Sequence, residues 1–91
     1  MRFIFDPRKR AANLLKHGFD LKEAQAVIES GLAVSWEDRR FDYGEERFLT
    51  AGPLGGRLVT IVTAESADEI RIISMREATK NEKTFYRENS G

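Results

Sequence analysis

The chain has 91 residues, no cysteine, 41% hydrophobic and 33% charged residues, and 15 basic against 15 acidic side chains. These values predict a single globular domain over residues 1–91, exclude a disulfide framework or a thiolate metal site, and argue against a basic protein that coats nucleic acid. No apolar run reaches the ~7–15 residues of a secretion signal or the ~20 of a membrane span, so we expect a cytoplasmic protein with no membrane partner.

The charge is unevenly distributed along the chain. Residues 1–22 hold six Lys/Arg against two Asp, residues 23–46 hold two Arg against seven acids, and residues 47–91 hold seven against six. A neutral protein with a basic end can still carry a local phosphate-binding patch. The same pattern is equally typical of solvated helix faces.

The first third of the chain predicts one strand and two helices. A short strand is expected at residues 2–5. Asp6, followed by proline, is a typical helix N-cap, and the helical pattern ends at Gly18. Asp20, with a glutamate three residues later, is a second capping signature, and the apolar spacing that follows predicts a helix ending near Gly31.

Beyond residue 31 the apolar side chains alternate with polar ones, which predicts strands. We expect strands at residues 34–36, 47–52, 58–64 and 70–75, with turns at residues 41–46, 52–56 and 65–69. Thr79 and Glu82 have the spacing of a capping box that opens a last helix through Tyr86.

This order, β-α-α-β-β-β-β-α, indicates the α+β class. Strands joined by short links predict a small antiparallel sheet of about four strands in a meander, with helices packed on one face. The other face would then be open to a partner or a substrate.

The last predicted strand carries two arginines, Arg71 and Arg76. In a regular strand these two residues point to opposite faces. A bulge or turn at the end of the strand could bring Arg76 round. Each arginine could also simply pair with a nearby acid, such as Glu45, Glu46 or Glu69.

Two further residues are candidates for proton transfer. His17, the single histidine, ends the first predicted helix, where it could act as a general acid or base or could only complement the helix dipole. Glu45 could be a base or a charged strand entrance. One histidine without cysteine does not build a typical zinc site, and residues 52–56 lack the lysine of a phosphate-binding loop, so we expect no metal and no cofactor.

Several short motifs occur along the chain, and their order and spacing together are more informative about the family than any single motif. They are Phe5-Asp6-Pro7, Asn13, Lys16-His17-Gly18, Glu23-Ala24, Gly44-Glu45-Glu46-Arg47, Gly52, the run from Arg71 to Thr79, Glu82 and Tyr86. Together they resemble the BrnT family, the toxin halves of bacterial and archaeal type II toxin–antitoxin pairs. The resemblance covers nearly the whole chain.

The resemblance implies a RelE-like ribonuclease fold and a metal-independent endoribonuclease that cleaves RNA and so inhibits translation. The implied catalytic residues are Arg76, Arg71, His17 and Glu45, and the implied RNA-binding residues are Lys16, Arg47 and Lys80. Two positions depart from many relatives: Met75 replaces an alanine, and the turn at residues 65–69 is acidic instead of carrying an arginine.

The resemblance also implies a tight complex with a ribbon-helix-helix antitoxin of the BrnA type. Operator DNA would be bound only through that complex, and a homodimer or a 2:2 heterotetramer would be compatible with it. The main alternative is an antitoxin-binding co-repressor with little or no nuclease activity. A third interpretation is a domain that binds RNA without cleaving it.

Overall fold

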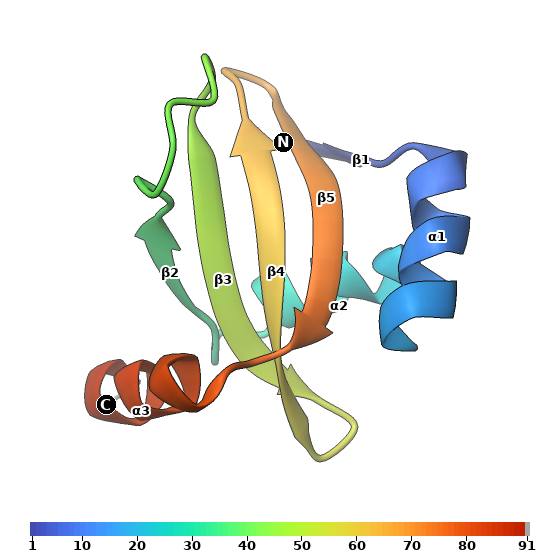
Figure 1. Ribbon diagram of the computed structural model, residues 1–91. Helices are drawn as coiled ribbons and strands as arrows, with labels where there is room; N and C mark the ends of the chain where they lie inside the picture. The colour runs from blue at the N-terminus through green and yellow to red at the C-terminus, as the bar shows by residue number, and fades with distance from the viewer. Residues whose placement is uncertain (91) are drawn as a thin grey trace.

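The computed structural model describes residues 1–90, which form a five-stranded sheet flanked by helices (Figure 1). The strands are β1 (Arg2–Ile4), β2 (Val34–Glu37), β3 (Arg47–Leu54), β4 (Arg57–Glu65) and β5 (Glu69–Glu77). The helices are α1 (Pro7–His17), α2 (Ala24–Ile28) and α3 (Lys80–Asn89), with a 3₁₀ turn, η1 (Leu21–Glu23), before α2. The predicted α+β class and order of elements are confirmed. No helix of residues 1–90 is long and apolar enough to span a membrane.

The helix ends follow from local hydrogen bonds. The Asp6 side chain accepts from a backbone N–H of the first turn of α1, and Gly18 ends the helix with a φ of 77°. At α3, Thr79 and Glu82 form both bonds of the predicted capping box. Asp20 caps a 3₁₀ turn, so the predicted second helix is η1 followed by the short α2.

The sheet is mixed and has one strand more than the meander. Strands β2 to β5 pair antiparallel in chain order, as predicted. β1 adds a fifth strand, parallel to β5, from Arg2 opposite Glu69 to Ile4 opposite Arg71. The expectation of a purely antiparallel sheet of about four strands was therefore incomplete. β1 covers part of the β5 edge, whose backbone groups would otherwise lack partners.

A β-bulge interrupts β5 at Ile73. The pairing with β4 passes from Ser74 opposite Val62 directly to Ile72 opposite Thr63, so Ile73 has no partner of its own. Beyond this point the alternation of β5 side chains between the two faces of the sheet is shifted by one residue. Ile72 and Met75, three residues apart, consequently both point into the core and are 2% and 0% exposed.

The same bulge places Arg71 and Arg76 on one face of the sheet. Arg71 lies opposite Ala64 and Arg76 lies opposite Thr60, two β4 residues an even number of positions apart. Directly opposed residues in an antiparallel pair project to the same side. The strand is thus not regular, and the alternative that a bulge brings Arg76 round is confirmed, with the bulge at Ile73 and not at the end of the strand.

Asn13 of α1 holds the edge of β5 just past the bulge. Its amide nitrogen donates to the carbonyls of Met75 and Phe19, both at 2.9 Å, and its amide oxygen accepts from the Met75 N–H at 3.0 Å. Asn13 is 6% exposed. A buried side chain thus replaces the strand partner that β1, ending at Ile4, does not supply.

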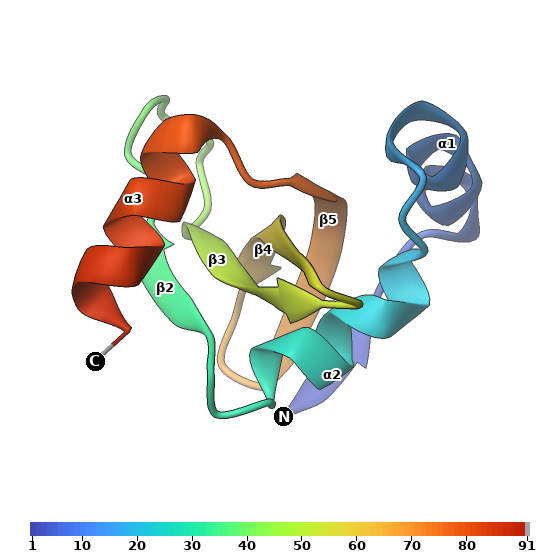
Figure 2. The same ribbon diagram turned by 90° about the horizontal axis from the view of Figure 1, so that it is seen from below.

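Helices cover both faces of the sheet. α2 packs on the face formed by the main hydrophobic core, where Val27 lies against Gly52 of β3. On the opposite face Phe85 of α3 packs on Trp36 of β2, with ring centroids 4.9 Å apart. Figure 2 shows α2 and α3 on opposite sides of the strands. The prediction that helices pack on one face is thus wrong, because β3 and β4 are apolar on both sides.

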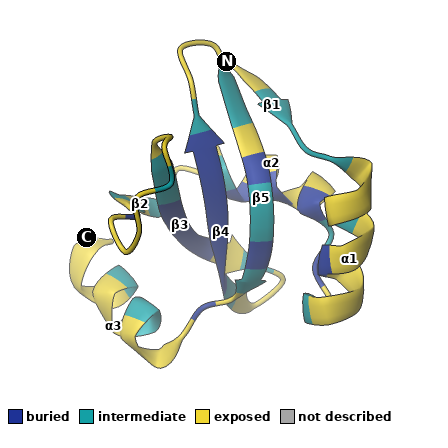
Figure 3. Ribbon diagram, turned by 45° about the horizontal axis from the view of Figure 1, so that its top comes forward, coloured by how far each residue is buried: buried dark blue, intermediate teal, exposed yellow. Residues whose placement is uncertain are grey.

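The core lies between α2, η1 and the centre of the sheet. Its buried members are Phe19, Leu21, Ala24, Val27, Val59, Ile61, Ile72 and Met75. Figure 3 shows β4 buried along most of its length while the helices expose their outer sides. Met75 therefore fills a core position.

Replacing Gly52 by alanine should destabilise the protein by about 1–3 kcal/mol. An added Cβ would lie 2.6 Å from Cγ1 of Val27, closer than side chains approach in folded proteins. Urea unfolding measures the loss. In the double variant Gly52→Ala with Val27→Ala the loss should be smaller than the sum of the single changes. If the two losses of stability were strictly additive, Val27 would not be the group that clashes with the added Cβ at position 52.

Candidate functional site

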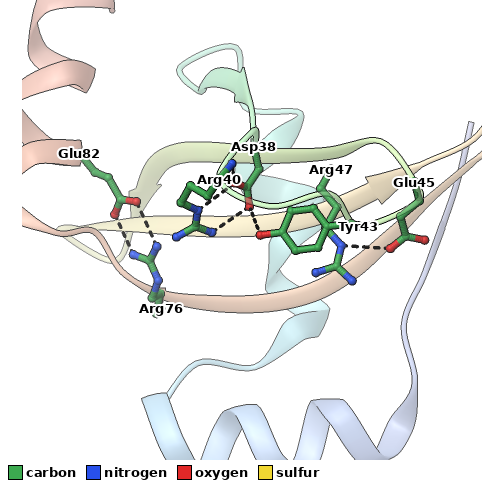
Figure 4. Close-up of polar contacts among 7 residues, drawn as sticks. All are labelled: Asp38, Arg40, Tyr43, Glu45, Arg47, Arg76 and Glu82. Atoms are coloured by element: carbon green, nitrogen blue, oxygen red, sulfur yellow. Dashed lines mark hydrogen bonds and ion pairs between the residues drawn. The ribbon is translucent and has the colours of Figure 1, made fainter.

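One face of the sheet carries a row of arginines, which we call the arginine face. Arg47 of β3 and Arg71 of β5 both lie opposite Ala64 of β4. Arg76 lies farther along the same face, opposite Thr60 of β4. Arg40, from the loop at residues 38–46, lies in a row with Arg47 and Arg76, as Figure 4 shows. The sheet therefore gathers cations from segments far apart in the sequence.

Glu45 lies between two arginines of this face. Its carboxylate accepts from Nε of Arg47 at 3.0 Å and from Nη2 of Arg71 at 2.9 and 3.0 Å. The hydrogen bond from Arg47 and the charge of Arg71 lower the pKa of Glu45 although desolvation opposes the shift. A carboxylate held in this state is a weak proton acceptor near neutral pH.

Arg76 is ion-paired with Glu82 of α3. Its guanidinium donates to both carboxylate oxygens of Glu82, at 2.7 and 3.0 Å. Glu82 also accepts from the Thr60 hydroxyl at 3.0 Å and from the Thr79 N–H at 2.8 Å. Burial alone would raise the pKa of Glu82, but these hydrogen bonds lower it to about 2. Arg76 therefore joins β5, β4 and the start of α3 through one partly buried acid, Glu82.

The loop at residues 38–46 is anchored by Asp38. The Asp38 side chain is fully buried and accepts from Nε and Nη2 of Arg40 at 2.8 Å and from the Tyr43 hydroxyl at 3.0 Å. Hydrogen bonding from Arg40 holds the pKa of Asp38 well below its usual range despite burial. Arg47 lies over the Tyr43 ring at 4.1 Å, and Phe41, 69% exposed, meets that ring edge-on.

His17 and Lys16 lie apart from the row of arginines, at the end of α1. With Lys9, they line a hollow of about 250 Å³ between α1 and β5, and Ile73 and Ser74 line its other side. By register Ser74 lies on the arginine face, opposite Val62 and so between Arg71 and Arg76. The bulge residue and its neighbour therefore connect the histidine hollow to the arginine face.

The predicted site residues thus form two groups, and Arg76 and Lys80 lie outside both. Glu45, Arg47 and Arg71 are in direct contact, and Lys16 shares the hollow of His17. Lys80 is exposed in the first turn of α3 and takes part in neither group. The suggested pairing of Arg71 with Glu45 is confirmed, whereas Arg76 pairs with Glu82 instead of the acids named from sequence.

Sequence analysis missed Asp38, Arg40 and the hydrogen bonds of Asn13. An aspartate two residues before an arginine is the only local signal for the first pair, and it is common in exposed loops. Asn13 is part of a motif, but its role was not predictable, because Met75, with which it forms two of its three hydrogen bonds, lies 62 residues away. Among residues 1–90, no three His, Cys, Asp or Glu side chains gather closely enough to hold a metal ion.

These features define a small α+β protein with arginines and carboxylates paired across one face of its sheet. The family model described as the ribonuclease toxin BrnT of type II toxin–antitoxin systems matches residues 5–82, so the chain belongs to this family. The match includes every site residue predicted from sequence. It confirms the resemblance, and membership implies an antitoxin partner. No curated protein matches the sequence.

Replacing Glu82 by glutamine should lower the free energy of unfolding at pH 7 by about 1–3 kcal/mol. The folded-state pKa of Glu82, about 2, is below its ordinary value of 4.5. The stabilisation is therefore present above pH 4.5 and lost as the pH falls from 4.5 to 2. Urea unfolding across this range should show the difference between wild type and variant shrinking.

Glu88→Gln, an exposed change on the same helix, is the matched control and should leave stability nearly constant. A deficit of Glu82→Gln that stays the same from pH 7 to pH 2 would contradict the role of the Arg76–Glu82 pair.

Proposed function

We propose that this protein cleaves RNA without a metal ion and thereby inhibits translation. The ribose 2′-oxygen would lose its proton to a base and bond to the adjacent phosphorus. The bond from phosphorus to the 5′-oxygen would break, and an acid would protonate that oxygen. The observation that carries the proposal is the single histidine in a hollow that borders a row of arginines on the sheet.

The arginines suit the charge that develops during this reaction. The pentacovalent phosphorane carries more negative charge than the substrate, and fixed guanidinium groups stabilise it without reorganisation. We assign this role to Arg71 and Arg76. Arg47, Lys16 and Lys80 would contact the RNA backbone, which arginine and lysine bind through phosphate oxygens.

His17 is the better of the two candidates for proton transfer. Imidazole is the side chain that most often transfers protons in enzymes, whereas the pKa of Glu45 is lowered by its arginine partners. Asn13 lies one turn before His17 on α1 and ties the helix to β5. This tie supports a fixed placement of the imidazole relative to Ser74.

The protein freed of antitoxin should cleave single-stranded RNA in EDTA, and Arg71→Ala should lower the rate about 10²–10³-fold. Loss of one preorganised cation from the phosphorane is the physical reason. Gel assays of labelled RNA measure the rate. Arg57→Ala is the matched control, because Arg57 is also a strand arginine paired with a glutamate but lies opposite Leu54, away from the arginine face.

His17→Asn should lower the rate about 10²–10⁴-fold with unchanged RNA binding. Arg76→Ala should also reduce cleavage, but it leaves Glu82 unpaired, so a thermal melt must accompany it. Full activity of Arg71→Ala and Arg76→Ala, or cleavage that stops in EDTA, would contradict the proposal.

We further propose a ribbon-helix-helix antitoxin of the BrnA type as the partner, with operator DNA bound only through the complex, as a homodimer or a 2:2 heterotetramer. One observation also favours the alternative of a co-repressor with little nuclease activity. Within residues 1–90 each arginine of the arginine face already has a carboxylate partner, so the face is electrostatically satisfied without RNA.

Growth after induction separates the two functions. In cells without the antitoxin, induction of the wild-type protein should arrest growth, and Arg71→Ala should relieve the arrest, because cleavage depends on that cation. Colony counts after induction measure the effect, with Arg57→Ala as the control. Normal growth with wild-type protein at a level confirmed by immunoblot would favour the co-repressor.

A further inference from the structure

The Glu45 carboxylate has the surroundings that a phosphate group would need. Arg47 and Arg71 come from different strands and converge on it with three N···O distances of 2.9 to 3.0 Å. Distances in this range are typical of charge-assisted hydrogen bonds to carboxylate and phosphate alike. Two guanidinium groups aimed at one anion thus form an anion-binding position that the protein fills with its own side chain.

Glu45 is the most replaceable acid of the arginine face. The carboxylates of Asp38 and Glu82 accept from additional donors and are 0% and 14% exposed. The Glu45 side chain is 33% exposed, and within residues 1–90 only Arg47 and Arg71 donate to it. An incoming anion can therefore take its place by exchanging one set of ionic hydrogen bonds for another.

There is space beside the pair for such an exchange. Glu45 and Arg71 line a hollow of about 200 Å³ whose wall also includes Ile4, Ala64, Ser66 and two further acids, Glu65 and Glu69. Glu45 itself belongs to the loop at residues 38–46, whereas Arg47 and Arg71 belong to strands of the sheet. Rotation of the Glu45 side chain away from the arginines, into this hollow, would therefore leave the sheet that holds Arg47 and Arg71 unchanged.

We propose that Glu45 is an internal competitor that occupies a phosphate-binding position between Arg47 and Arg71, and that an RNA phosphate displaces it when RNA binds. The inference rests on the proposed function and adds a control on the same site. The free protein holds RNA weakly because each binding event must first release a carboxylate. Glu45 therefore sets the affinity for RNA and its dependence on salt.

The test is binding of a fully 2′-O-methylated single-stranded oligonucleotide, which has no 2′-hydroxyl to attack the phosphate. Fluorescence anisotropy in EDTA is measured over a range of salt for wild type, Glu45→Gln and Glu77→Gln. Glu77 also accepts two hydrogen bonds from one arginine, but it lies opposite Val59 on the core face. Both variants change the net charge from 0 to +1, so only the position differs.

Glu45→Gln should bind about tenfold more tightly than wild type at low salt, while Glu77→Gln should change the affinity less than about twofold. One more neutralised phosphate should steepen the logarithmic salt dependence by about 0.7. Glu45→Ala should also tighten binding. This second variant shows that the effect comes from loss of the carboxylate and not from a hydrogen bond of the introduced glutamine amide. Circular dichroism melts verify that the variants are folded.

Affinity of Glu45→Gln equal to that of Glu77→Gln, or weaker than wild type, would overturn the inference. The result is independent of cleavage. If natural RNA is not cleaved but the Glu45 variants bind more tightly, the proposed function fails and the internal competitor remains. If RNA is cleaved and the Glu45 variants bind like wild type, the inference alone fails.

Discussion

The unpartnered residue Ile73 in β5 is the constraint on which the rest of the structure depends. Without the bulge, alternation through the strand would direct Arg71 and Met75 to the same side, and a guanidinium beside the apolar core would be costly without a partner. With it, Met75 enters the core and Arg71 lies on the arginine face with Arg76. Asn13 supplies the hydrogen bonds at the edge where the irregular strand continues.

Each arginine of the arginine face is paired with a carboxylate, and these carboxylates differ in the number of their hydrogen bonds and in their exposure. Glu82 serves a helix cap and an ion pair at once, and Asp38 anchors a loop from a fully buried position. Glu45 has only its two arginines and is partly exposed. Stability is thus concentrated at one end of the row, and the other end retains a site whose internal anion can be exchanged.

The chemistry proposed for this family member depends on two elements meeting at β5. α1 brings His17 and Lys16 to a hollow that Ser74 shares, and the sheet brings the arginines alongside. Proton transfer and charge stabilisation would then come from different elements, joined by the bulge and by Asn13. This division explains why Glu45, directly paired with arginines, suits control of phosphate binding better than proton transfer.

The sequence alone determined the class, the order of elements, the family, both ends of α1 and the start of α3. Asp6, Gly18 and the Thr79–Glu82 box act within a few residues of themselves, so their hydrogen bonds can be anticipated from spacing. The parallel pairing of β1 with β5, the face chosen by α3, the bulge and the partner of Arg76 were decided only by the tertiary structure. Each depends on contacts between distant segments or on a one-residue shift in register, and alternation of side chains within a single strand contains no information on either.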